Sequence, residues 1–310
     1  MLVEEELVRV SPEKDTLLTI GVFDGVHLGH KYLISKLKKS AEQENLLSGV
    51  VTFRQHPLEV LAPETVLPYL TNCEEKVELL KAEGVDIVVP LTFTPELAGL
   101  TAREFTGLLK KHLRMCGLVI GPDFTLGKDR EGNVSVLREL GREMGFSVTM
   151  IAAMNFFGEV VSSTAIRKYL KEGDLKNVSK LLGRSFSLQG TVVRGDGRGR
   201  TLGFPTANLE VDSVQSLLPE GVYATWIHIG EEKYPSVTNI GKRPTFGSNE
   251  RTVETYVIGF SGDLYDQELK IDIVDLLRGE KKFQNTDELK KQILDDIEKG
   301  KSALGLAPNG

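Results

Sequence analysis

The fold of the first half of the chain is decided by residues 17–30, which read LLTIGVFDGVHLGH. The apolar run from Leu17 to Phe23 is typical of a buried strand, and the segment from Gly29 to Glu44 predicts a helix with one apolar face. A helix that starts directly after a buried strand presents its free backbone amides at the carboxyl end of that strand. In an open α/β sheet this edge is where ligands bind, so we expect a ligand site here.

Strand-like and helix-like segments continue to alternate outward from this stretch through the first half. We predict further strands at 47–53, 86–90, 118–120, 147–152 and 159–161, and helices at 74–83, 101–112 and 133–144. One of these helices begins with Thr101-Ala-Arg-Glu104, which has the sequence of a capping box. The alternation predicts a Rossmann-like α/β domain with a parallel sheet covered by helices.

The second half has a different pattern, in which short β-branched or alternating segments are separated by turns that contain glycine and proline. Expected strands lie at 186–194, 221–229, 234–239, 253–260 and 268–276, and a helix at 286–299 follows them. This pattern predicts a small antiparallel β-barrel with a closing C-terminal helix. We place the boundary near Leu182 to Ser185, which gives domains 1–183 and 184–310.

Composition excludes several classes of protein and partner. The net charge is -6 and the basic residues are dispersed, so a nucleic acid duplex is a poor partner. Cys73 and Cys116 have no second ligand at metal spacing, which argues against a disulfide or zinc site. No apolar run approaches the roughly 18 residues that would span a bilayer, and the acidic N-terminus lacks the order of a secretory signal. We expect a cytoplasmic protein without a membrane partner, as a monomer or weak oligomer.

Two of the chain's five histidines, His27 and His30, lie in the opening stretch with Gly29 between them. In the first helical turn both imidazoles can face one polyphosphate, and the glycine allows the backbone to approach it closely. Their expected task is to donate hydrogen bonds to charge that builds on an α-phosphate during displacement. The alternative is that both are ordinary polar residues of a loop.

A second anion-binding feature is expected far along the chain, at Ser162-Ser-Thr-Ala-Ile-Arg167. This segment opens a helix after a short strand, and it offers cap hydroxyls, free amides and an arginine one turn later. For this segment alone, a well-capped helix with a solvated arginine explains the residues as well.

Together the two segments resemble the FMN adenylyltransferase module of bacterial bifunctional FAD synthetases, within the HxGH nucleotidylyltransferase superfamily. The resemblance covers residues 15–170 and includes Thr52-Phe53, His56-Pro57 and Gly121-Pro-Asp-Phe-Thr-Leu-Gly127. It implies that ATP is bound by Gly21, Phe23, Asp24, His27, Gly29, His30, Ser162, Thr164 and Arg167. It also implies that Pro57 and Asp123 border the flavin ring. Relatives often carry a proline in place of Gln55 and an aromatic residue in place of Leu126. Because leucine has no aromatic ring, this chain lacks a possible stacking partner for the flavin at position 126.

The segment from Gly190 to Asn208, GTVVRGDGRGRTLGFPTAN, is dense in glycine and arginine. Gly195, Gly197, Gly199 and Gly203 permit backbone shapes in which several amides converge on an anion, and Arg198 and Arg200 can add charged donors. No Walker A sequence is present, because no Gly-Lys-Ser/Thr follows at the right distance. A flexible hairpin loop is the alternative interpretation of this segment.

Two hard oxygen donors, Thr206 and Asn208, stand two residues apart at the end of this segment. On extended backbone they share one side, where they suit a Mg²⁺ ion bound with phosphate and water. Glu254 is a lone carboxylate in the apolar strand Val253–Phe260, and the period of two could aim it inward, where it could accept a proton from a substrate hydroxyl. Ordinary turn residues and a solvent-facing glutamate are the alternatives.

This second set of segments resembles riboflavin kinase over residues 184 to about 300. The matching segments are 199–208, 221–223, 239–246, 253–255 and the Arg278-Gly-Glu-x-x-Phe283 motif. The resemblance implies that Thr206 and Asn208 bind Mg²⁺ and ATP, that the glycine segment holds phosphate, and that Glu254 is the base for the ribityl 5′-hydroxyl. Where relatives often show histidine and aspartate after this glutamate, the chain has Tyr256 and Gly259.

The two resemblances predict a bifunctional enzyme that phosphorylates riboflavin to FMN and then adenylylates FMN to FAD, with ATP as donor and Mg²⁺ as cofactor. Two other functions remain open at this point. The HxGH module could adenylylate another phosphorylated metabolite, or the chain could be a flavin-binding sensor with a degenerate kinase fold.

Overall fold

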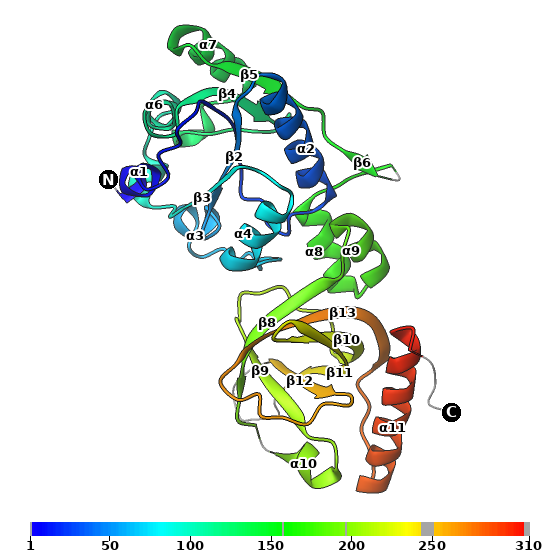
Figure 1. The fold of residues 1–310 in the computed structure, drawn as a ribbon. Coiled ribbons are helices and arrows are strands. Elements are labelled where there is room, and N and C mark those ends of the chain that lie inside the picture. The colour runs from blue at the N-terminus through cyan, green and yellow to red at the C-terminus, as the bar shows by residue number, and fades with distance from the viewer. Residues whose placement is uncertain (1, 157, 196, 243–250, 307–310) are drawn as a thin grey trace. The chain divides into compact units, whose positions relative to one another are not determined.

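The computed structural model describes residues 2–156, 158–195, 197–242 and 251–306. By its internal contacts the chain separates into two compact units, Met1–Ser163 and Thr164–Gly310, which Figure 1 shows as ribbons. Nearly all of α8 (Ser163–Glu172) and all of α9 (Leu175–Leu182) fall in the second unit. The boundary near Leu182 to Ser185 therefore stays a prediction about the functional modules.

The first unit is built on a five-stranded parallel sheet with the order β3-β2-β1-β4-β5, so the predicted α/β fold is confirmed. Its strands are β1 (Thr16–Ile20), β2 (Leu47–Phe53), β3 (Ile87–Leu91), β4 (Met115–Ile120) and β5 (Ser147–Met150). The helices are α1 (Leu2–Val8), α2 (Leu28–Gln43), α3 (Leu58–Leu61), α4 (Cys73–Ala82), α5 (Pro95–Ala98), α6 (Ala102–Leu113) and α7 (Val134–Met144), with a 3-10 turn at Lys128–Arg130. A two-stranded hairpin of β6 (Asn155–Phe156) and β7 (Glu159–Val160) follows.

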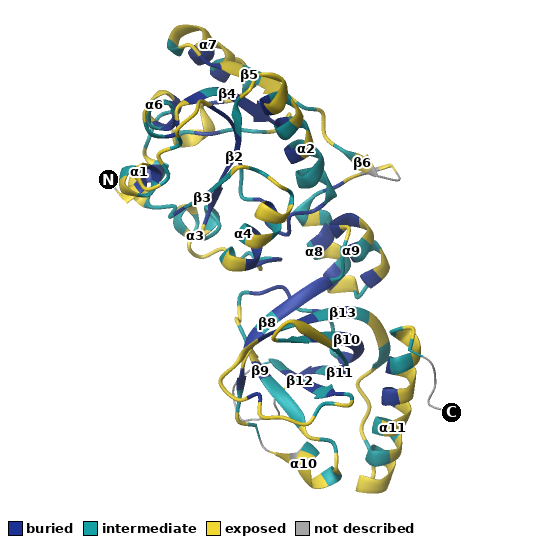
Figure 2. Cartoon of the chain, in the orientation of Figure 1, coloured by how far each residue is buried: buried dark blue, intermediate teal, exposed yellow. Residues whose placement is uncertain are grey.

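Strand β1 is buried on both faces, because it lies at the centre of the sheet with helices on each side (Figure 2). Leu17 belongs to a hydrophobic cluster with Leu37 of helix α2, whereas Leu18 belongs to another cluster with Leu109 of helix α6. Strand order reverses at β1, since β2 and β3 extend the sheet on one side and β4 and β5 on the other. This reversal is the topological switch point at which α/β folds bind ligands.

Two local predictions in this unit can be compared with the structure in detail. The strand expected at Leu17–Phe23 ends at Ile20, because Phe23 has a φ of 52° and Val26 a φ of 37°, which turn the chain out of the sheet. The capping box is confirmed: the Thr101 hydroxyl accepts from the Glu104 amide at 3.2 Å, and the Glu104 carboxylate accepts from the Thr101 amide at 2.8 Å.

The second unit is a closed antiparallel barrel with the strand order β10-β11-β12-β9-β8-β13, as predicted. Its elements are β8 (Phe186–Val193), α10 (Arg198–Leu202), β9 (Thr206–Val211), β10 (Gly221–Ile229), β11 (Glu232–Lys242), β12 (Arg251–Val257), β13 (Glu268–Gly279) and the closing helix α11 (Thr286–Ala303). Strands β6 and β9 and helices α1, α3, α5, α9 and α10 were not among the predicted elements. Helix α10 replaces part of the predicted glycine loop and lies between Gly197 and Gly203, whose φ angles of 69° and 89° are left-handed.

The inside of the barrel contains a chain of buried hydroxyl groups among the apolar side chains. The hydroxyl oxygen of Thr225 lies 2.7 Å from that of Ser236 and 2.8 Å from that of Thr238. The hydroxyl oxygen of Thr238 lies 2.9 Å from that of Thr255. All four residues are fully buried, and each hydroxyl has a partner, so the cost of burying them is offset. Helix α11 packs on the outside of the barrel, where Ile297 contacts Val222 and Val237. Over the described ranges, no helix has both the length and the apolar character needed to span a bilayer.

Candidate active sites

His27 caps the first helix of the α/β unit at the switch point. Its Nδ1 accepts a hydrogen bond from the backbone amide of His30 at 3.3 Å, so the ring proton resides on Nε2. The two imidazoles are stacked, with their centroids 3.6 Å apart and their planes 16° apart. The structure therefore brings the predicted pair together at the carboxyl end of β1, and the cap fixes which nitrogen of His27 is a donor.

His30 is half-buried, but its Nδ1 is shielded from solvent and has no hydrogen-bond partner among the described residues. Burial, and next the neighbouring His27 and Lys76, hold the pKa of His30 well below its usual value. The imidazole is therefore neutral at pH 7. An unpartnered ring nitrogen at this position suits a polar ligand, because a buried polar atom without a partner is otherwise costly.

The loop around Asp24 is held by its own side chains. The Asp24 carboxylate accepts from the amides of Leu70 and Thr71, at 2.8 Å and 3.1 Å, and the Thr71 hydroxyl accepts from the Gly25 amide at 3.1 Å. These contacts fasten the loop after β1 to the segment before α4. The expected contact of Asp24 with ATP stays a prediction.

The predicted anion-binding segment at residues 162–167 contacts the loop after β1 through Ser163. The Ser163 hydroxyl donates to the carbonyl of Asp24 at 2.9 Å, although the two residues lie 139 positions apart. A Cβ added at Gly29 would lie 3.1 Å from the carbonyl oxygen of Val161 and from ring atoms of His27, so a larger residue here would have to displace these neighbours slightly. Ser163, which sequence reasoning did not single out, thus connects the start of α8 to the loop that holds Asp24.

The remaining residues of that motif occupy the first turns of α8. Ser162 directly precedes the helix and is half-buried, Thr164 is exposed in the first turn, and Arg167 is half-buried one turn later. Their expected contacts with ATP phosphates stay predictions.

The two expected flavin-side residues follow the strands on either side of β1. Pro57 precedes helix α3 after β2, and Asp123 lies in a turn after β4. Because the carboxyl ends of parallel strands share one edge, both stand at the edge where the histidine pair lies. Gln55 donates to the Phe93 carbonyl at 2.8 Å, and Leu126 is buried in the hydrophobic core.

A buried lysine that sequence reasoning missed lies at the same edge of the sheet, at the carboxyl ends of the strands. Lys76 of helix α4 is 4% exposed, and its ammonium donates to the carbonyl of Phe53, the last residue of β2. Burial lowers the pKa of Lys76. Its position in an ordinary amphipathic helix gave no signal in the sequence.

In the barrel unit, Glu254 lies directly opposite Asn208 of β9 on one side and Asn239 of β11 on the other. Directly opposite residues of antiparallel strands point to the same face, so the three side chains form one line across three strands. We call Asn208, Glu254 and Asn239 the polar row. Thr206 shares its face, since it lies two residues before Asn208.

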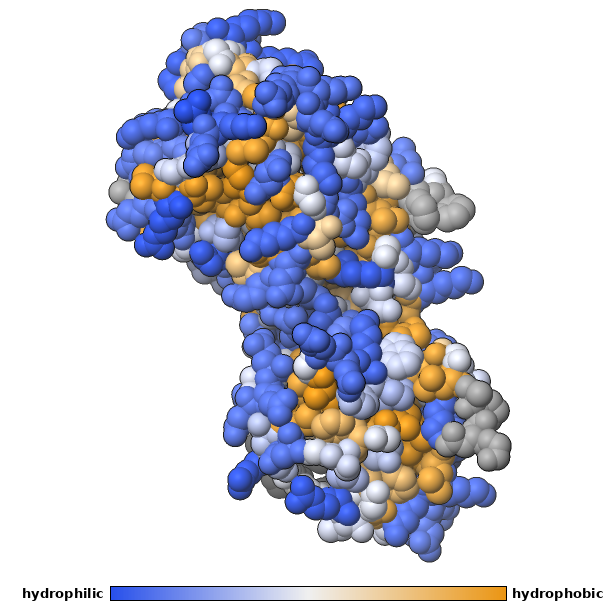
Figure 3. All heavy atoms as spheres, in the orientation of Figure 1, coloured by the Kyte–Doolittle hydropathy of each residue, from blue (hydrophilic) through white to orange (hydrophobic). Residues whose placement is uncertain are grey.

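Glu254 does not point into the barrel, so the expected inward orientation is wrong. Val253 and Thr255, its neighbours along β12, are buried at 2% and 0% exposure and fill the interior, which leaves Glu254 half-buried on the outer face. There it lines a cavity of about 590 Å³, together with Thr206, Asn239 and residues of α11. In the view of Figure 3, apolar side chains gather on the barrel beside α11.

The glycine segment folds directly against the two predicted metal ligands. A Cβ added at Gly195 would lie 2.4 to 2.6 Å from the side-chain amide atoms of Asn208, and one added at Gly199 would lie 3.3 Å from the Thr206 hydroxyl. The absence of side chains at 195 and 199 therefore shapes a cradle around these oxygens. Arg200 is exposed, the side chain of Arg198 is not among those described, and residues 243–246 of the predicted kinase motif lie outside the described ranges.

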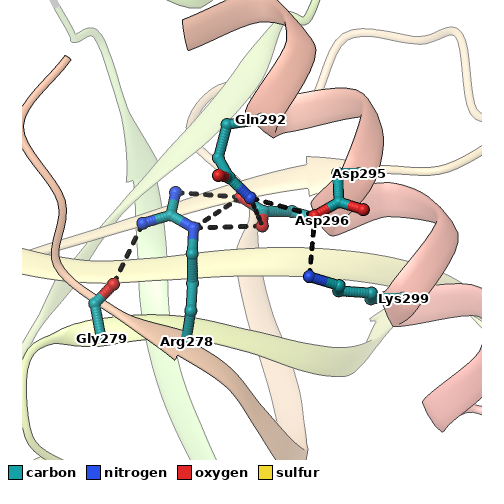
Figure 4. A network of polar contacts seen from close by, with 6 residues as sticks. All are labelled: Arg278, Gly279, Gln292, Asp295, Asp296 and Lys299. Atoms are coloured by element: carbon teal, nitrogen blue, oxygen red, sulfur yellow. Dashed lines mark hydrogen bonds and ion pairs between the residues drawn. The ribbon is translucent and has the colours of Figure 1, made fainter. Parts of the chain in front are cut away.

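A buried ion pair fixes the far wall of this cavity (Figure 4). The Arg278 guanidinium donates to both carboxylate oxygens of Asp296 on α11, at 2.9 to 3.1 Å, and to the carbonyl of Gly279 at 3.0 Å. Gln292 donates to the same carboxylate at 2.9 Å. The ring of Phe283 lies 5.6 Å from the guanidinium carbon. Sequence reasoning noted Arg278 and Phe283 as a motif but not that Asp296 completes it.

Each unit thus carries one cluster of polar side chains, the histidine pair in the first and the polar row in the second. A family model described as FAD synthetase matches residues 10–165, and one described as riboflavin kinase matches residues 182–304. The chain belongs to the family of bifunctional riboflavin kinase/FMN adenylyltransferases.

Individual relatives agree with this assignment. The bifunctional riboflavin kinase/FMN adenylyltransferase of Escherichia coli (strain K12) is 38% identical over 96% of this chain and 95% of its own length. The protein of that description from Listeria monocytogenes is 34% identical over 90% of both chains. A crystal structure described as a macrolide-efflux protein from Streptococcus pneumoniae has a TM-score of 0.85 at 30% identity over 96% of both chains. That likeness concerns the fold, whereas the family assignment comes from the sequences.

Proposed function

We infer that the chain converts riboflavin to FMN in its barrel and FMN to FAD in its α/β unit, with ATP as the donor in both reactions. The observation that carries the inference is the presence of two separate polar sites in one chain. One is the histidine pair at the switch point, and the other is the polar row, of which Glu254 and Asn239 line the cavity beneath α11.

In the kinase reaction, Glu254 accepts the proton of the ribityl 5′-hydroxyl while that oxygen attacks the γ-phosphorus of ATP, and ADP leaves. Thr206 and Asn208 supply hard oxygen atoms in the cradle beside Gly195 and Gly199, a donor set that fits Mg²⁺. The ion would neutralise charge on the phosphates of ATP. The glycine segment, from Gly195 to Gly203, holds the phosphates in place through its amides.

In the adenylyl transfer, the phosphate of FMN attacks the α-phosphorus of a second ATP, and pyrophosphate leaves. No general base is needed, because the phosphate nucleophile is already ionised. His27 donates from Nε2, and with neutral His30 and the amides at the start of α2 it stabilises the charge that develops. Ser162, Thr164 and Arg167 complete the phosphate contacts, while Pro57 and Asp123 border the flavin.

The division of labour predicts that the Glu254→Gln variant loses one activity only. FMN formation from riboflavin should fall by at least about 100-fold, because general base catalysis is removed. FAD formation from supplied FMN should stay at the wild-type rate. Chromatographic separation of FMN and FAD after incubation with Mg²⁺ and ATP measures both.

The matched control is Glu268→Gln, which alters an exposed glutamate of β13 in the same barrel and should change neither rate. Equal loss of both activities in folded Glu254→Gln protein would show that the assignment of the two reactions is wrong. Flavin binding by the wild-type protein without any turnover would favour the sensor instead.

We also propose a cytoplasmic location, a monomeric or weakly associating state, and no nucleic acid or membrane partner. The support against a nucleic acid partner is the net charge of -6 and the dispersed basic residues. Size-exclusion chromatography with light scattering tests the oligomeric state.

A further inference from the structure

Several polar groups that line the cavity beneath α11 already have a task, whereas Asn239, which stands next to Glu254, has none. Arg278 and Asp296 bind each other, while Thr206 and Glu254 are assigned to ATP and to the acceptor hydroxyl. Asn239 lines the same cavity and is half-buried. Across the described ranges, its side-chain amide makes no hydrogen bond to another protein group. An amide in such a position is ready to bind a ligand.

The order of residues in the polar row indicates which part of the ligand lies beside Asn239. Strands lie about 4.8 Å apart, so Asn208 and Asn239 stand about 10 Å from each other with Glu254 between them. On the proposed function, the phosphate donor lies at Asn208 and the attacking hydroxyl lies at Glu254. The rest of the acceptor molecule must then extend to the other side of Glu254, which is the side of Asn239.

A glycine beside Asn239, Gly241, leaves the side-chain amide of Asn239 accessible. Gly241 lies two residues farther along β11 and so on the same face. A Cβ added there would lie 3.4 Å from Nδ2 of Asn239 and 2.9 Å from a carboxylate oxygen of Glu280. A side chain at 241 would therefore press on the amide and on the adjoining cavity wall.

We propose that Asn239 binds the ribityl chain of riboflavin at the 4′-hydroxyl, next to the hydroxyl that is phosphorylated, and so determines acceptor specificity. The inference rests on the kinase function proposed above. An amide both donates and accepts hydrogen bonds, which matches a hydroxyl group, whereas the ionised Glu254 only accepts. Holding the adjacent hydroxyl also orients the 5′-oxygen for in-line attack.

The test compares riboflavin with 4′-deoxyriboflavin as acceptors for the wild type and the Asn239→Leu variant, which keeps the size of the side chain without its amide. For the wild type, kcat/KM should be at least about tenfold lower with the deoxy compound, because the amide loses its partner. In the variant, kcat/KM for riboflavin should fall about tenfold, and the ratio of the two acceptors should approach 1. The KM for ATP should not change.

An unchanged acceptor ratio in the variant would overturn the proposal. The Gln189→Leu variant is the matched control, because it removes a half-buried amide from β8 that does not line the cavity, and its ratio should equal that of the wild type. FAD formation from FMN and thermal unfolding report whether each variant is folded. If wild-type protein fails to phosphorylate riboflavin at all, the proposed function fails, and that outcome is distinct from an unchanged ratio.

Discussion

The half-buried ring of His30, with its shielded Nδ1, makes a prediction about pH. Its pKa lies well below the ordinary value near 6.5, mainly because of burial. Below pH 6.5 the unfolded chain binds a proton at this residue and the folded chain does not, so the α/β unit loses stability as the pH falls. Each unit of pKa depression corresponds to about 1.4 kcal/mol of this loss. In NMR titration, the ring carbon-bound protons of His30 should keep their neutral chemical shifts from pH 7.5 down to about pH 6.

Assignment of the signal uses the His30→Gln variant, in which it must disappear. A midpoint at or above pH 6.5 would contradict the shielded, neutral state. Addition of ATP supplies a second readout at this residue, because phosphate charge beside the ring favours its protonated form and should raise the midpoint.

Gly195 makes a prediction about the kinase cradle. A methyl group at this position would lie 2.4 to 2.6 Å from the amide of Asn208, closer than non-bonded atoms can approach. In the Gly195→Ala variant Asn208 must therefore move, and FMN formation should fall about 100-fold, as expected for a shift of about 1 Å at a reacting site. FAD formation from FMN should be unaffected. Steady-state assays of both reactions measure the difference.

The comparison variant is Gly279→Ala, because no atom lies within 4 Å of the position that its added methyl group would take. It should retain FMN formation. Equal rates of FMN formation by the two alanine variants would show that the cradle does not require glycine at position 195.

Among the elements, α11 owes its position to one ion pair as well as to apolar packing. Replacing Asp296 by asparagine leaves the Arg278 guanidinium, which is 21% exposed, without its charged partner. Removing one member of a largely buried pair should destabilise the barrel by about 3 kcal/mol. Urea unfolding followed by the fluorescence of Trp226, the only tryptophan of the chain, reports on the barrel because this residue lies on β10.

The neighbouring Asp295 provides the control on the same helix. It pairs with Lys299 at 2.7 Å, and both side chains are about half-exposed. Exposed pairs contribute little, so Asp295→Asn should leave the unfolding midpoint nearly unchanged. Similar midpoint shifts in both variants would mean that the buried pair has no special role.

For the whole molecule, the separation of the two sites predicts that defective chains complement each other. The Glu254→Gln variant should make FAD from FMN only, and the His30→Gln variant should make FMN from riboflavin only. A mixture of the two should convert riboflavin to FAD, because FMN released by one chain can bind to the other. The FAD formed over time is measured by chromatography.

Each variant alone is the control and should form almost no FAD from riboflavin. If the mixture fails while supplied FMN is still adenylylated, FMN does not pass between chains through solution. That result would point to transfer within a single chain.

Local sequence determined much of this protein. Strands β2 and β10 occur at the predicted residues 47–53 and 221–229, and the Thr101 capping box forms as expected. These features depend on side-chain periods of two or 3.6 residues and on cap residues, which act within one element. The histidine pair was equally evident, since both rings belong to one helical turn.

Only the tertiary structure decided how distant residues meet. Strand pairing placed Glu254 between Asn208 and Asn239, and the burial of Val253 and Thr255 inside the barrel left that glutamate on the outer face. The period of two shows that alternate residues share a face of β12, but not which face is covered by apolar side chains from elsewhere. The partners of Ser163 and Arg278 likewise come from remote segments. Such contacts arise from the burial of whole elements against each other, and no local pattern records that.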